Sequence, residues 1–68
     1  MDLSQFVKYK RKLLQITQSE LAEKAGVGLR FVRELEQGKE TLRMDKVNQV
    51  LGLFGSNLAP VQMKKESE

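Results

Sequence analysis

The chain has 68 residues, a formal net charge of +3 and a pI of about 9.5, which limits it to one small, basic domain. It contains no cysteine and no histidine, so disulfides, thiolate metal sites and histidine-based catalysis are excluded, and we expect no enzyme, no metal and no cofactor. No apolar run could span a membrane and no secretory signal opens the sequence, so the expected location is cytoplasmic.

Residues 3–14 are expected to form the first helix, because apolar side chains recur there at helical spacing. Asp2 and Gln5 match a capping box at its start. The expected inner face consists of Leu3, Phe6, Val7, Leu13 and Leu14. The outer face carries Lys8, Lys10, Arg11 and Lys12, a cluster that is either a solvated face or an edge facing phosphate.

A second helix starts at Thr17, which forms a capping box with Glu20. Its inner face is expected to consist of Leu21, Ala22 and Ala25. Gly26 suits the left-handed position that commonly ends a helix. The Val27 side chain is then expected to pack into the core and so anchor the following turn.

The third helix is predicted over residues 29–37, between a weak cap at Gly28 and a terminating Gly38. Val32 and Leu35 point inward, which leaves the outer face to Arg30, Arg33, Glu34 and Gln37. Two short helices joined by a tight turn, with a polar outer face on the second, are typical of a helix-turn-helix. This arrangement places one helix in the major groove of DNA.

A fourth helix is expected over residues 44–54, where an apolar stripe has helical spacing: Val47, Val50, Leu51 and Phe54. Its start at Arg43 is poorly capped. Gly52 is expected to lower the stability of the helix in which it lies, and Gly55 is expected to end that helix.

The tail over residues 56–63 is short, apolar and expected to be extended, and residues 64–68 are expected to be disordered. Pro60 restricts any strand here to one-sided pairing. We expect it to pair with its copy in a second chain through Leu58, Val61 and Met63, forming a two-stranded ribbon across a dimer. The alternative is a frayed end.

The residues TQSELAEKAGV, with EQGK at the end of the third helix, resemble the phage-repressor-like helix-turn-helix family, the XRE family. The resemblance covers roughly residues 3–55 without a gap. It rests on Thr17, Gln18, Leu21, Ala22, Ala25, Gly26, Val27, Val32, Leu35, Glu36 and Gly38. Within that family, LRMDKVNQVLG and a brief apolar tail are similar to the HipB-type antitoxins.

The resemblance implies that the third helix is the recognition helix, whose base-facing residues are Leu29, Arg30, Arg33 and Glu34. It also implies that Gln18 contacts phosphate and supports that helix, and that Arg11 and Glu36 form a salt bridge between helices one and three. Arginine can grip guanine with two hydrogen bonds, worth about 1–3 kcal/mol against a wrong base, and glutamate can accept from cytosine. Further candidate phosphate contacts are the helix start at Thr17, Gln37 and Lys39.

Phe31 departs from the family pattern, which usually has Ser or Thr there. It either packs sideways against the fourth helix or a partner chain, or contacts a thymine methyl. We take packing as the interpretation.

We therefore expect an all-α fold of four helices with a short C-terminal β-strand. Residues 1–55 form the DNA-binding domain and residues 56–63 the dimerisation tail. The expected function is sequence-specific repression, by a homodimer on a palindromic operator of double-stranded DNA. The HipB resemblance implies an antitoxin that autoregulates its operon and binds a kinase-like toxin. The alternatives are a prophage or restriction-modification regulator, or a protein-interaction adaptor that lost DNA binding.

Overall fold

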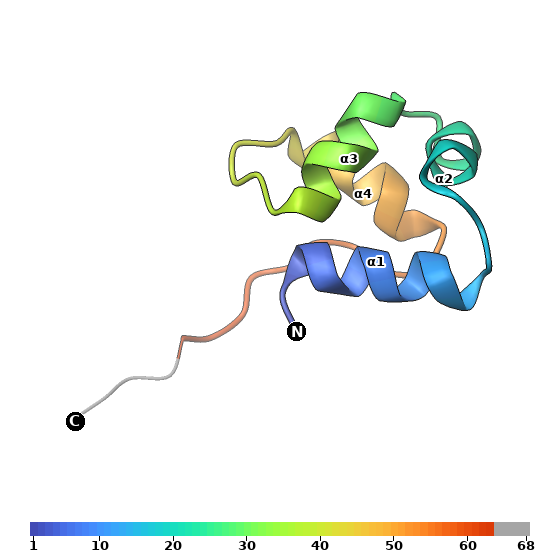
Figure 1. Ribbon diagram of the computed structural model, residues 1–68. Helices are drawn as coiled ribbons and strands as arrows, with labels where there is room; N and C mark the ends of the chain where they lie inside the picture. The colour runs from blue at the N-terminus through green and yellow to red at the C-terminus, as the bar shows by residue number, and fades with distance from the viewer. Residues whose placement is uncertain (64–68) are drawn as a thin grey trace.

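A computed structural model of the chain describes residues 1–63, which form four helices (Figure 1). These are α1 (Leu3–Leu13), α2 (Gln18–Ala25), α3 (Leu29–Gln37) and α4 (Met44–Gly52). The predicted all-α architecture is confirmed, and the expectation for residues 64–68 lies outside the described residues. Among residues 1–63, every helix is too short or too polar to cross a bilayer.

All four helices contribute to one apolar core. α3 packs on both α1 and α2, and α2 also packs on α4. The buried side chains are Val7, Leu21, Ala22, Val32, Leu35, Val47, Val50 and Leu51. The predicted inner faces of the second, third and fourth helices are thus largely confirmed. Because α3 is held from its inner side, its outer side is left free for contacts with another molecule.

The helix ends follow the local sequence signals. Both predicted capping boxes are formed, at Asp2 for α1 and at Thr17 for α2. Gly26 ends α2 in the left-handed conformation, with φ 74°, and the Val27 N–H then donates to the Ala22 carbonyl at 3.0 Å. This conformation, which favours glycine, turns the chain sharply enough to bring α3 onto α2.

The predicted inner face of the first helix is wrong at its C-terminal end, where Leu13 and Leu14 are 58% and 52% exposed. Leu13 lies six residues after the buried Val7, which is about 120° away round a helix. Leu14 is the C-cap, beyond the last helical turn. Ile16 packs against the core instead.

The predicted end of the fourth helix is also corrected, because α4 stops at Gly52 and the chain turns through residues 53–55. Gly52 is therefore the last helical residue, where the cost of an interior glycine does not apply. Gly55 has φ 69°, and the next residue, Ser56, donates its N–H to the Leu51 carbonyl at 2.9 Å. Phe54 lies outside the helix but still packs edge-on against Phe6, with ring centroids 6.4 Å apart.

The tail passes back beside α1 and then leaves the helical body (Figure 1). Residues 1–63 of the single chain contain no strand, so the expected C-terminal strand is not shown. The half-buried Leu58 side chain packs against its own core, and its N–H donates to the Asn48 Oδ1 at 2.7 Å. Its expected role in a dimer contact stays a prediction. Val61 and Met63 are 85% and 83% exposed, so an intermolecular ribbon through them stays a prediction.

Candidate nucleic-acid interface

A buried carboxylate ties the three N-terminal helices together. Glu36 of α3 accepts hydrogen bonds from the Arg11 guanidinium of α1 at 2.7 Å and 3.1 Å. It also accepts one from the Gln18 amide of α2 at 2.9 Å. The exposed fraction of the Glu36 side chain is only 2%, against 14% for Arg11. This cluster fixes α3 relative to α2, as a rigid readout helix requires.

The charge of Glu36 is stabilised in place. Burial on its own raises the pKa of this carboxyl group. The hydrogen bonds from Arg11 and Gln18, together with the positive charge of Arg11, outweigh burial and hold the pKa below its ordinary value of 4.5. Glu36 is therefore ionised at neutral pH, and the Arg11–Glu36 pair that the resemblance implied is formed as an ion pair.

The outer face of α3 carries a carboxylate flanked by two cations. Glu34 Oε2 lies 3.5 Å from Arg30 Nε, one turn earlier, and Glu34 Oε1 lies 3.5 Å from Lys39 Nζ. The Glu34 side chain is 27% exposed, whereas Arg30 is 91% exposed. Glu34 thus holds the side chains of Arg30 and Lys39 beside it, and part of its own carboxylate stays exposed to solvent.

Arg33 stands on the same face without such a restraint. It lies three residues after Arg30 and four before Gln37, which places these side chains on one side of the helix. It is exposed, and no ion pair among residues 1–63 involves it. Its guanidinium can therefore engage an outside acceptor without first breaking an internal pair.

The two apolar residues at the start of α3 have a different environment. Leu29 and Phe31 are half-buried and pack against the core. This favours packing, rather than thymine contact, as the interpretation of Phe31. Leu29 can offer only its exposed edge to a base. Gly28 caps α3 without a side chain, so this end of the helix is open to close approach.

The expected phosphate contacts lie at helix ends. The Thr17 hydroxyl oxygen accepts from the Glu20 N–H at 3.1 Å in the cap, which leaves its own O–H proton to donate to a phosphate. The amide of Gln18 is bonded to Glu36, which leaves its backbone N–H in the first turn of α2 as the group suited to an anion. Gln37 and Lys39, at the end of α3, are exposed.

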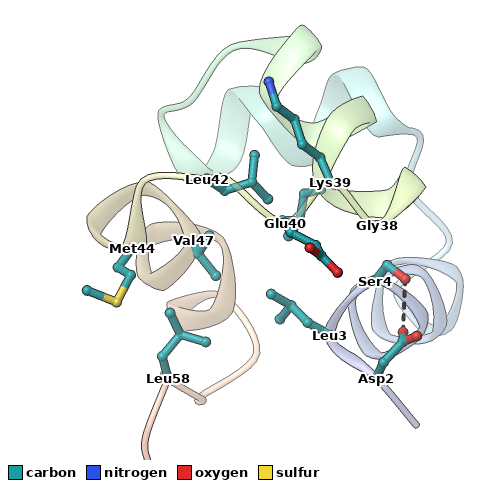
Figure 2. A pocket seen from close by; sticks show the side chains of 11 residues that line it. Asp2, Leu3, Ser4, Gly38, Lys39, Glu40, Leu42, Met44, Val47 and Leu58 are labelled. Atoms are coloured by element: carbon teal, nitrogen blue, oxygen red, sulfur yellow. Dashed lines mark hydrogen bonds between the residues drawn. The ribbon is translucent and has the colours of Figure 1, made fainter.

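A hollow that the sequence interpretation missed lies beside α4 (Figure 2). It has a volume of about 390 Å³ and is formed by α1, the loop after α3, α4 and the tail. Its apolar lining includes Leu3, Leu42, Val47 and Leu58, and Met44 stands at its edge, 70% exposed. The available signal was Leu42, an apolar residue in a segment treated only as a loop.

Comparison with known proteins gives two findings. The chain matches the family described as Helix-turn-helix over residues 7–61, a range that includes all of α2, α3 and α4. It is also 45% identical over 67 residues to a protein of Sinorhizobium fredii (strain NBRC 101917 / NGR234). That relative is named "Uncharacterized HTH-type transcriptional regulator y4mF", and the match covers 94% of this chain and 88% of the relative.

Proposed function

This chain belongs to the XRE-type helix-turn-helix family of transcriptional regulators, and from that premise we propose that it represses its own operon as a homodimer on a palindromic site. Two copies would place their α3 helices in successive major grooves, about 34–36 Å apart. The observation that carries the proposal is the exposed, unrestrained Arg33 on a helix held rigid from behind by Glu36.

In the proposed complex, residues of the α3 outer face have different roles. Arg33 donates two parallel hydrogen bonds to guanine. Arg30 contacts a neighbouring base edge and keeps its ion pair with Glu34. Glu34 accepts from cytosine or repels a misplaced phosphate. Leu29 contributes an apolar edge. Phosphates are bound at the α2 start by Thr17 and Gln18 and at the α3 end by Gln37 and Lys39.

The test is fluorescence anisotropy on the DNA upstream of the protein's own gene, against a scrambled duplex, at two salt concentrations. We expect tight, salt-dependent binding to the upstream DNA only. Arg33→Lys keeps the charge but loses the planar fork, so it should weaken specific binding about tenfold and relax preference at one base pair.

A matched control removes one positive charge elsewhere. Lys10 lies over the Phe6 ring at 5.6 Å, on the side of α1 where Phe6 meets Phe54. Lys10→Gln should leave specific binding nearly unchanged, whereas Arg33→Gln should abolish most of it. Equal losses in both variants would reduce the role of Arg33 to general charge. Equal weak binding to both duplexes would favour the adaptor alternative.

The antitoxin role is a finer proposal. It is supported by the resemblance of the α4 region to HipB-type antitoxins and by apolar surface outside the α3 face, at Val61, Met63 and the hollow beside α4. In this proposal a kinase-like toxin binds the dimer away from the DNA. Co-purification with the product of an adjacent gene would support it. A protein that purifies alone and binds the operator fully would instead be a free-standing regulator.

A further inference from the structure

The side of α1 that faces away from α3 carries exposed apolar groups. Tyr9 and Leu13 are 50% and 58% exposed, and they are four residues apart, so they adjoin on one face of the helix. Arg11, two residues from each, lies about 200° round the helix and points into α3 through Glu36. The Tyr9–Leu13 row therefore lies opposite the row that holds α1 to the fold.

The same surface is positively charged. Lys8 and Lys12 form the adjoining row, also four residues apart and exposed. No ion pair within residues 1–63 includes Lys8, Lys10 or Lys12. Among the acids beside α1, Asp2 is its N-cap, and Glu36 of α3 is already paired with Arg11. We call Lys8, Tyr9, Lys12 and Leu13 the α1 outer face. It combines an apolar row with an unneutralised basic row.

We infer that the α1 outer face is a docking surface for an acidic amphipathic helix of a partner protein. An apolar row on that helix would cover Tyr9 and Leu13, while carboxylates beside it would pair with Lys8 and Lys12. Tyrosine is among the residues that most often dominate binding energy in interfaces. This inference goes beyond the proposed repressor and does not depend on operator binding.

Charge selects this occupant over the others that the surface could meet. A second copy that covered Tyr9 and Leu13 with the same face would bring its own Lys8 and Lys12 close to this lysine row, which has no acid within it, and like charges repel. DNA phosphates would satisfy the lysines but leave the Tyr9 ring and the Leu13 side chain in water. An acidic amphipathic helix satisfies both rows at once.

The test uses two short helical peptides, each with leucines along one row, flanked in one peptide by glutamates and in its twin by lysines. The full-length protein is titrated with each peptide, and its backbone amide NMR signals are followed. We expect the acidic peptide to shift the signals of residues 8–14 saturably and its basic twin to have no effect. Tyr9→Ser combined with Leu13→Ser should weaken the acidic peptide about tenfold or more.

A charge swap and a control make the result specific. Lys8→Glu combined with Lys12→Glu should exchange the preference, so that the basic peptide binds and the acidic one does not. Met44→Ser, which removes an apolar group that is 70% exposed outside this face, should change nothing. Binding of neither peptide, or equal binding of both, would overturn the inference.

Two further measurements separate this surface from other partners. Binding to vesicles of anionic lipid but not to the acidic peptide would assign the face to a membrane, and would overturn the inference. If the lysine swap weakened operator binding while the acidic peptide failed to bind, the face would instead be a phosphate-facing edge. The variant with Tyr9→Ser and Leu13→Ser should lose the acidic peptide but retain operator binding. Failure of the docking inference is therefore seen in peptide binding, and failure of the proposed repressor is seen in operator binding.

Discussion

Arg33 and Glu36, three residues apart in α3, have opposite environments. Arg33 is exposed, and no ion pair within the described part of the chain involves it. Glu36 is buried beneath Arg11 and Gln18. The first can bind an outside acceptor, and the second holds the helix that presents it. Both are charged residue types, so charge alone does not distinguish a residue that contacts DNA bases from one that holds the helix in place.

The first residue-scale prediction concerns the support. Arg11→Met keeps the apolar stem but leaves the Glu36 carboxylate buried beside an uncharged side chain. Removing one partner of a buried pair costs about 3–5 kcal/mol, a large part of the stability of a small domain. We expect a large drop in the urea midpoint followed by circular dichroism. Arg43→Met removes an exposed pair with Asp45 and serves as the control, with little change expected.

The same pair makes stability depend on pH in a defined direction. The pKa of Glu36 is lowered on folding, so the stability it contributes is fully present above its ordinary value of 4.5. That contribution is lost as the pH falls through the lower folded value. The deficit of Arg11→Met relative to the native protein should therefore shrink on acidification below 4.5. Asp2 and Asp45 also have lowered pKa values, but both proteins contain them. A deficit that stays constant with pH would contradict this role.

At the scale of elements, most helix bounds could be predicted because their signals are local. Capping boxes and left-handed glycines act within one turn of chain, and the structure forms them at Thr17 and Gly26. Periodicity groups residues on one face but does not say where a neighbouring helix stops covering them. The offset of Leu13 from Val7, about 120° round the helix, could have been read from the spacing, whereas nothing in the sequence could predict that Leu58, beyond the last helix, would pack inward.

The candidate site divides in the same way. The outer face of α3 follows from its inner face, so Arg30, Arg33 and Gln37 could be placed from spacing alone. The pairing of Glu34 with Lys39 needed the structure, because Lys39 lies beyond the end of the helix. The left-handed conformation of Gln15, with φ 58°, could not be predicted either. Positive φ is uncommon for residues other than glycine, so a glutamine does not indicate it.

The element-scale prediction concerns the start of α3. Gly28 has ordinary φ and ψ, and a Cβ built there meets nothing within 4 Å. Gly28→Ser should raise the free energy of unfolding by about 0.5 kcal/mol, because the hydroxyl caps a free N–H and the unfolded chain loses freedom. Gly28→Ala reduces the same freedom without a cap and should be about 1 kcal/mol less stable than the serine variant. Equal urea midpoints for the two would argue against the hydroxyl as a cap.

At the scale of the whole molecule, two sets of exposed apolar side chains are candidate contact surfaces, apart from single exposed residues such as Met44 and Leu53. One is the α1 outer face, and the other is the tail beside the hollow at α4. A small core of this kind leaves little stability to spare, so a partner at either place would stabilise the fold by mass action. Charge distinguishes them: the α1 outer face repels its copy, whereas the tail around Val61 and Met63 has no charged residue within residues 56–63. This makes the tail the better candidate for contact between two copies.

The whole-molecule prediction tests that contact. Deleting residues 61–68 keeps Leu58 and its bond to Asn48, so the helical body should stay folded. We expect a lower dimer fraction by light scattering and weaker operator binding, because one copy reads only a few base pairs. The variant with Tyr9→Ser and Leu13→Ser also loses exposed apolar surface but should keep the native mass. An unchanged mass after the deletion would place the dimer contact elsewhere, and the hollow between α1 and α4 would then be the next surface to alter.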